Sequence, residues 1–274
     1  MTERLPTGSG AHTAWRVGLA LVLTLGLGAC ATGPATLHAG ADPITESDES
    51  PQRKRARIRL ELAVGYFEEG RIPIALDEIK QSLAHDPDHA PAYNLRGLVY
   101  MRMNDPRQAE DSFRRALALD PRDGDTLHNL GWLACQLARH DEAQRLFDQA
   151  LASPFYPARA RTHMVQGLCH ARAGRLGEAE RSLARSYELD AANPVTGYNL
   201  AQLLFRRGEL PRAQFYIRRL NNSDAANAES LWLGIRVEER LGDRVAMQQL
   251  ADQLKKRYPQ SRELAAYDKG SFNE

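Results

Sequence analysis

The sequence has little of what enzymes and nucleic-acid-binding proteins usually carry. Its 36 basic and 35 acidic side chains give a formal net charge of +1, so no excess of positive charge favours a nucleic acid as partner. Only 5 of the basic residues are lysine, and we attribute the 31 arginines to coding bias. No serine stands in a nucleophile elbow and no glycine-rich loop could hold a phosphate. We therefore expect a protein that is not an enzyme and does not bind nucleic acid.

Cysteine is also scarce, with three residues in the chain, Cys30, Cys135 and Cys169. The histidines that could join them in a metal site are His128, His140, His163 and His170. No pair among these residues has the C-x-x-C or H-E-x-x-H spacing that places two ligands on one helical face. The sequence therefore predicts no metal ion, and it predicts no other cofactor.

The hydrophobic run near the N-terminus is too short to span a membrane. It covers residues 17–29, which is 13 residues, whereas a spanning helix needs about 20. Arg4 and Arg16 precede it, and this arrangement is typical of an export signal that is later removed. We expect residues 1–29 to be a signal peptide.

The end of that run carries a lipidation signal. Leu27, Gly28 and Ala29 precede Cys30, and this stretch resembles the bacterial lipobox that the lipoprotein signal peptidase cuts. The resemblance implies a diacylglyceryl thioether on Cys30 and an acyl chain, such as palmitate, on its amine. Ala31 is not the aspartate that retains lipoproteins in the inner membrane of enteric bacteria, so we expect an anchor in the periplasmic face of the outer membrane. The alternative is a conventional signal that is cut elsewhere, with Cys30 incidental.

The stretch that follows the lipid site has the composition of a tether. Residues 31–51 contain Pro, Gly, Ser, Thr and acidic residues without hydrophobic periodicity. We expect residues 30–52 to form the lipidated N-terminus and a solvated link to a folded domain over residues 53–262, with a C-terminal tail over 263–274.

Internal repeats organise the domain, because one pattern recurs with a period of 34 residues. The segment 90–123 serves as the reference, and it resembles the tetratricopeptide repeat at places 4, 8, 11, 20, 24, 27 and 32. These places hold Tyr93, Gly97, Tyr100, Ala109, Phe113, Ala116 and Pro121. The predicted repeats are about 56–89, 90–123, 124–157, 160–193, 194–226 and 227–260. The resemblance implies an all-α fold, a right-handed superhelix of about six helical hairpins.

Each consensus place has a physical reason. Gly97 and Ala109 remove bulk where the two helices of a hairpin must approach closely. Pro121 ends the second helix because it has no amide hydrogen to donate. The register slips by two residues between the third and fourth repeats, where Pro154 and Pro157 indicate an altered turn.

The repeat register also predicts a binding surface, since places 2, 5, 9 and 12 of each first helix face the concave side. The predicted groove residues are Leu60, Val64, Phe67, Asn94, Leu98, Met101, His128, Trp132, Met164, Leu168, Tyr198 and Phe205. This set is mostly apolar, so it suits the apolar face of a helix or strand from a protein partner. Trp132 is the expected anchor. The alternative for any one residue is packing against an adjacent helix.

The two remaining cysteines could form a disulfide. Cys135 and Cys169 lie 34 residues apart on successive first helices, which pack side by side. An exported protein meets an oxidising compartment, so we expect them to be bonded. The alternative is a pair of small buried residues that stay reduced because helices packed about 8–10 Å apart hold them out of reach.

Three stretches, residues 123–143, 153–180 and 228–261, resemble the type IV pilus biogenesis and stability lipoproteins, the pilotins built of tetratricopeptide repeats. The likeness covers about residues 53–262, and Leu233 to Arg236 is its most specific part. It implies a protein that binds secretin subunits and promotes their localisation to the outer membrane and their assembly there. We expect a monomer, because the chain is almost neutral and tetratricopeptide arrays commonly stand alone. The alternative is a scaffold lipoprotein of a β-barrel insertion complex or of a cell-wall synthase.

Overall fold

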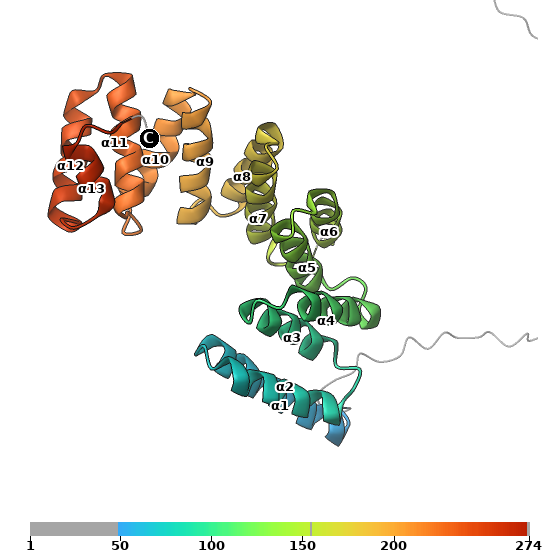
Figure 1. The fold of residues 1–274 in the computed structure, drawn as a ribbon. Coiled ribbons are helices and arrows are strands. Elements are labelled where there is room, and N and C mark those ends of the chain that lie inside the picture. The colour runs from blue at the N-terminus through green and yellow to red at the C-terminus, as the bar shows by residue number, and fades with distance from the viewer. Residues whose placement is uncertain (1–48, 154, 273–274) are drawn as a thin grey trace, which may run out of the picture. The chain divides into compact units, whose positions relative to one another are not determined.

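The computed structural model of the chain describes residues 49–153 and 155–272, and every regular element within them is a helix (Figure 1). Twelve of these helices pair into six hairpins. The hairpins are α1 (Pro51–Glu68) with α2 (Ile72–His85), α3 (Ala90–Arg102) with α4 (Pro106–Leu119), α5 (Gly124–Gln136) with α6 (His140–Ala152), α7 (Arg159–Arg172) with α8 (Leu176–Leu189), α9 (Pro194–Arg206) with α10 (Leu210–Asn221), and α11 (Ala228–Leu241) with α12 (Arg244–Arg257). The short helix α13 (Arg262–Asp268) follows them.

The hairpins stack in chain order, and each second helix packs on the first helix of the next hairpin. This arrangement confirms the predicted all-α superhelix of six hairpins. The lipid site at Cys30 and most of the tether lie outside the described residues. Among the residues that are described, no helix is both long and apolar enough to cross a membrane.

The hairpins close where the sequence places glycine against a large side chain. A Cβ atom on Gly97 would lie 2.4 Å from Cε1 of Phe113, and one on Gly131 would lie 2.8 Å from Cε1 of Phe147. Both phenylalanines are fully buried. Places 8 and 24 of a repeat are therefore in direct contact, and the missing side chain at place 8 is what lets the ring at place 24 fill the gap.

The altered turn between the third and fourth hairpins brings in an aromatic side chain that the repeat pattern does not contain. Tyr156 is 6% exposed and covers Gly124, whose Cβ, if present, would lie 2.5 Å from Cδ2 of the ring. The Tyr156 hydroxyl also lies 3.1 Å from Oγ1 of Thr162 on α7. The two-residue slip in the repeat register therefore places the Tyr156 ring between α5 and α7, and α7 begins only at Arg159.

The two ends of the domain differ from the sequence expectation. Helix α1 begins at Pro51, within the predicted tether, and the Ser50 side chain caps it by accepting a hydrogen bond from the Arg53 amide at 3.2 Å. At the other end, part of the predicted tail folds as α13, and Phe272 stacks on Trp232 with ring centroids 5.6 Å apart. These residues cover the last hairpin, as a terminal cap must in an array that buries each repeat on its neighbour.

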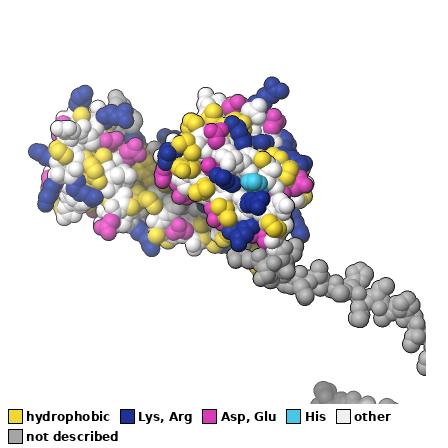
Figure 2. Space-filling model, turned by 90° about the horizontal axis from the view of Figure 1, so that it is seen from below, with side chains coloured by type: hydrophobic (Ala, Val, Ile, Leu, Met, Phe, Trp, Pro, Cys, Tyr) yellow, Lys and Arg dark blue, Asp and Glu magenta, His cyan; other side chains and the backbone are white. Residues whose placement is uncertain are grey.

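Ion pairs link neighbouring repeats on the side of the second helices. Arg139 contacts Glu110 at 2.8 Å, and Arg175 contacts Asp141 at 2.6 Å. On the face of the molecule that Figure 2 shows, basic, acidic and hydrophobic side chains are interspersed. Exposed pairs of this kind contribute roughly 0–1 kcal/mol each, so packing between hairpins, and not charge, holds the array together.

Candidate functional site

The first helices of four hairpins form a groove, which we call the inner groove. Its lining residues are Phe67, Leu98, Met101, Arg102, His128, Asn129, Trp132, Gln136, Arg161 and Val165, from α1, α3, α5 and α7. Five residues that the repeat register predicts for a binding surface are therefore brought together: Phe67, Leu98, Met101, His128 and Trp132. The groove runs across repeats because the lining positions recur at equivalent places of successive first helices.

Polar contacts between first helices fix part of this surface. The Asn129 side chain on α5 donates a hydrogen bond of 3.0 Å to Oδ1 of Asn94 on α3. Asn94, a predicted groove residue, is half-buried. The hydrogen bond from Asn129 on the neighbouring first helix therefore holds its side chain in place. The amide pair leaves this stretch of the groove polar but uncharged.

His128 is less available than the sequence suggests. It is only 2% exposed, and its Nδ1 lies 2.8 Å from Oγ1 of Thr162 on the next first helix. Burial, followed by the nearby charge of Arg161, lowers the pKa of His128 to about 4. The imidazole is therefore neutral near neutral pH, and it joins the third and fourth hairpins instead of presenting a free ring to a partner.

Arginines cover the predicted aromatic anchors. The guanidinium of Arg172 lies 4.7 Å from the ring centroid of Trp132, and that of Arg102 lies 5.6 Å from the ring of Phe67. Phe205 is 3% exposed, with the guanidinium of Arg240 at 4.3 Å from its ring centroid. Phe205 is thus a buried ring beneath arginine, not the exposed apolar contact that the sequence predicts, and a partner would meet the guanidinium first.

The other predicted groove residues lie outside the inner groove. Leu60 packs with the apolar core of the first two hairpins, and Val64 is 38% exposed nearby. Met164, Leu168 and Tyr198 pack against the core shared by the last three hairpins. Leu168 also lines a separate hollow between α7, α8 and α9. The predicted set is therefore divided between a real groove and ordinary inter-repeat packing.

Sequence reasoning missed the most regular feature of this face. Each of four first helices carries an arginine as its last or next-to-last residue, and we call these residues the arginine row: Arg102, Arg172, Arg206 and Arg240. All four are exposed, and Gln136 takes the equivalent place in α5. The signal was present in the sequence, because the last three recur at the repeat period of 34 residues. Coding bias alone does not explain this periodic spacing.

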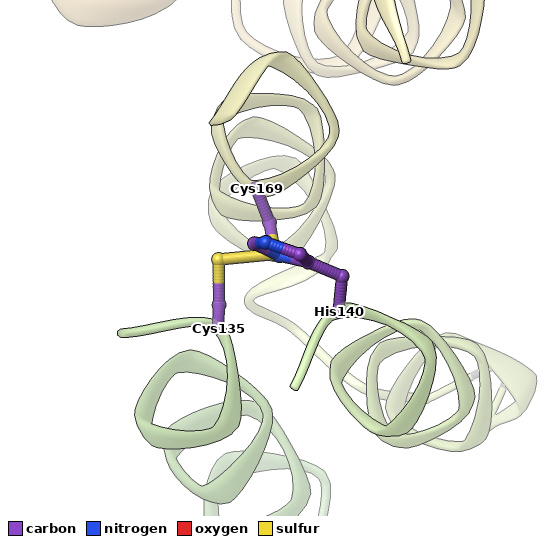
Figure 3. Close-up of a disulfide and its surroundings, with 3 residues drawn as sticks. All are labelled: Cys135, His140 and Cys169. Atoms are coloured by element: carbon purple, nitrogen blue, oxygen red, sulfur yellow. A yellow bond between two sulfur atoms is a disulfide. The ribbon is translucent and has the colours of Figure 1, made fainter. Parts of the chain in front are cut away.

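Cys135 on α5 and Cys169 on α7 form a disulfide, with their Cα atoms 5.9 Å apart (Figure 3). His140, at the start of α6, points toward this bond, and its Nδ1 lies 3.6 Å from Sγ of Cys169. The three side chains could in principle ligate a metal, since their ligand atoms lie within 4.8 Å of one another. Metal ligation needs thiolates, and both sulfurs are committed to the disulfide, so the geometry describes a crosslink between hairpins.

Comparisons with known proteins agree with the repeat register. The tetratricopeptide repeat family matches residues 90–123, 128–194 and 194–214. The type IV pilus assembly protein PilF of Pseudomonas aeruginosa is 28% identical over 248 residues, which are 90% of this chain and 96% of PilF.

Two solved structures are similar over most of their length. The structure of Pseudomonas aeruginosa PilF superposes with a TM-score of 0.72 at 27% identity, covering 81% of this chain and 100% of that one. The crystal structure of PilW, described as a widely conserved type IV pilus biogenesis factor, has a TM-score of 0.70 at 30% identity and covers 77% and 97%. The chain belongs to the family of tetratricopeptide-repeat proteins that includes the type IV pilus biogenesis factors PilF and PilW.

Proposed function

We propose that this protein is an outer-membrane lipoprotein that binds secretin subunits and promotes their localisation and assembly for type IV pilus biogenesis. The similarity to PilF and PilW along nearly their whole length is the observation that carries the proposal. The chain shares with them the repeat array as a whole, and not one isolated repeat that many unrelated proteins contain.

The inner groove supports a role in holding another protein. It spans four hairpins and combines apolar side chains, such as Leu98 and Met101, with polar and basic ones. A groove of this composition suits an extended or helical segment of a partner. A lipid on Cys30 would hold the bound subunit at the membrane, where its effective concentration for ring formation rises without any catalytic step.

Deletion and complementation test the proposal. Cells that lack the gene should lose surface pili and the detergent-resistant secretin multimers of the outer-membrane fraction, and the full-length gene should restore both. Normal multimers and normal piliation in the deletion strain would contradict the proposed function.

Affinity capture tests the partner directly. The full-length protein, solubilised in mild detergent, should retain secretin subunits. Selective retention of a β-barrel insertion protein or a cell-wall synthase, with no secretin, would instead support a scaffold role in another envelope machine.

A further inference from the structure

In the middle of the array, acidic residues are concentrated on the second helices. Helices α3, α5, α7 and α9 together contain six arginines and a single acidic residue, Asp125. The second helices α4, α6 and α8 also contain six arginines, but they carry eight acidic residues. The side of the array formed by α3, α5, α7 and α9 therefore has an excess of positive charge that the almost neutral overall composition does not reveal.

Several arginines near the second helices are paired across repeats, as in Arg139 with Glu110 and Arg175 with Asp141, although others there, such as Arg107, form no ion pair in the described part of the chain. None of the residues in the arginine row forms an ion pair with any carboxylate in the described part of the chain. A cation at a helix C-terminus is favoured by the helix dipole, but that preference alone does not explain why three of these side chains reach over the preceding hairpin.

Three members of the row lie over an aromatic ring of the preceding hairpin. Arg102 lies over Phe67, Arg172 over Trp132 and Arg240 over Phe205, at 5.6, 4.7 and 4.3 Å from the ring centroids. A guanidinium held by its face keeps the N–H donors along its edges free. The N–H donors along that edge can form a bidentate pair of hydrogen bonds with a carboxylate. Arginines that lie over the rings in this way are therefore oriented to bind an acidic group.

The basic groups also act on one another. Arg236, which lies 4.9 Å from the ring of Phe205, has a pKa lowered first by burial and then by the charges of Arg240 and Arg206. Burial, followed by the charge of Glu229, raises the pKa of Tyr198 near this end of the array. Helices α3, α7 and α9, which hold three of the four arginines of the row, contain no acidic residue, whereas α11 carries Glu229, Glu238 and Glu239 beside Arg240.

We propose that the face formed by the first helices binds a segment of a protein partner in which acidic residues alternate with apolar ones, and that the arginine row binds the carboxylates. This inference rests on the proposed function, since it names the chemistry of the segment that the partner inserts. The apolar residues of that segment would contact Leu98, Met101 and the exposed edge of Trp132.

The repeat geometry sets a spacing for the acids. Packed helices lie about 8–10 Å apart, and an extended chain advances about 3.3 Å per residue. Neighbouring arginines of the row on packed first helices, such as Arg206 on α9 and Arg240 on α11, should therefore be met by acidic residues at about every third position of an extended segment. Opposite Gln136, where the row has no charge, the partner needs no acid.

Peptide binding tests the proposal with the full-length chain in mild detergent. The probe is a fluorescently labelled peptide with Asp at every third position among leucine and serine, and its matched control has Asn in place of each Asp. We expect the Asp peptide to bind at least about tenfold more tightly, with an affinity that falls as salt rises. Equal affinity for the two peptides, or no binding of either, would overturn the proposal.

A pair of matched variants assigns the effect to the row. Arg102→Gln with Arg172→Gln and Arg206→Gln should abolish the preference for Asp. Arg107→Gln with Arg122→Gln and Arg145→Gln, three exposed arginines outside the row, should keep it. Melting temperatures establish that both triple variants are folded. If both triple variants lose the preference for the Asp peptide equally, the net charge of the protein, and not the arginine row, determines peptide binding. This result would overturn the proposal.

Three further outcomes distinguish this proposal from its alternatives. If replacing Asp42, Glu46 and Asp48 by their amides raises affinity for the Asp peptide about tenfold, the chain's own acidic stretch occupies the row, and the partner segment is excluded. Capture of secretin by the row variant, together with equal affinity of the wild-type chain for the two peptides, would reject this inference and leave the proposed function intact. If the wild-type chain prefers the Asp peptide but fails to capture secretin, the proposed function is rejected and this inference is kept.

Discussion

Single residues decide how closely the helices of a hairpin approach. The glycine at place 8 and the ring at place 24 interlock in the second and third hairpins, so their identities follow from the space available between two helices. Sequence reasoning found these positions because the demand for a small residue repeats with the fold. It did not find Tyr156, whose burial against Gly124 depends on a loop that occurs once and follows no repeat.

Gly97→Ala should therefore destabilise the protein, because the new Cβ would meet the buried ring of Phe113. Overpacking of this kind costs roughly 1–3 kcal/mol, which exceeds the gain of about 1 kcal/mol in helix propensity. Urea unfolding measures the change.

The control is Gly65→Ala in α1, where an added Cβ has nothing within 4 Å. It should stabilise the protein by up to about 1 kcal/mol through helix propensity alone. Equal effects of the two substitutions would show that the ring at place 24 does not set the requirement for glycine.

His128 should make stability depend on pH. Its pKa is about 4 in the folded protein, chiefly because of burial, and ordinarily about 6.5 in an unfolded chain. As pH falls from 6.5 toward 4, only the unfolded chain takes up the proton, so the free energy of unfolding decreases by up to about 3 kcal/mol over this window.

Urea unfolding at several pH values, compared between wild type and His128→Gln, isolates this contribution. The variant should lose less stability than wild type between pH 7 and pH 4.5, whatever its absolute stability, because glutamine does not titrate. Parallel pH profiles would show that the His128 imidazole is already accessible to protons in the folded state.

At the scale of helices and turns, the repeat period predicted the hairpins and their register. The pattern of glycine, alanine and aromatic residues at fixed places is strong because each place meets the same neighbours in every repeat. Helix α13 carries no such pattern, and only its contact with the last hairpin accounts for it. The division of the predicted groove residues between a real groove and inter-repeat packing depends on side-chain directions that the register alone does not give.

The crosslink between α5 and α7 should contribute to stability. It closes a loop of 34 residues, for which the chain-entropy model gives about 3–4 kcal/mol, and it spans the irregular turn before Arg159. Reduction should lower the midpoint of urea unfolding. The Cys135→Ala and Cys169→Ala double variant should be less stable than oxidised wild type and insensitive to reductant.

Mass spectrometry of the periplasm-matured protein under denaturing, non-reducing conditions measures the bond itself. Two cysteines that are fully alkylated without reduction would show that the exported protein does not form the crosslink.

At the scale of the whole molecule, the proposed binding surface and the proposed membrane anchor lie in different parts of the sequence. The groove belongs to the repeat array, whereas the predicted lipid site at Cys30 lies outside the described residues and some 20 positions before α1. The lipid site stays a prediction, which rests on the local signal of a lipobox. The spacing of the arginine row is visible in the sequence, but the position of Arg172 and Arg240 over aromatic rings of the preceding hairpin appears only in the structure.

This separation predicts two opposite defects in the proposed function. Cys30→Ser should leave the array folded and able to capture secretin, but it should release the protein from the outer membrane, because the thioether requires the sulfur. Trp132→Glu should remain in the outer membrane and capture secretin more weakly by roughly 1–3 kcal/mol, the usual size of an interface anchor. The new carboxylate would also lie beneath the guanidinium of Arg172 and compete with the partner for it. Membrane fractionation and affinity capture, each carried out on both variants, give a two-by-two comparison in which melting temperature controls for folding. If Cys30→Ser still fractionates with the outer membrane, the lipid is not the anchor; if folded Trp132→Glu captures secretin as wild type does, the groove is not the binding surface.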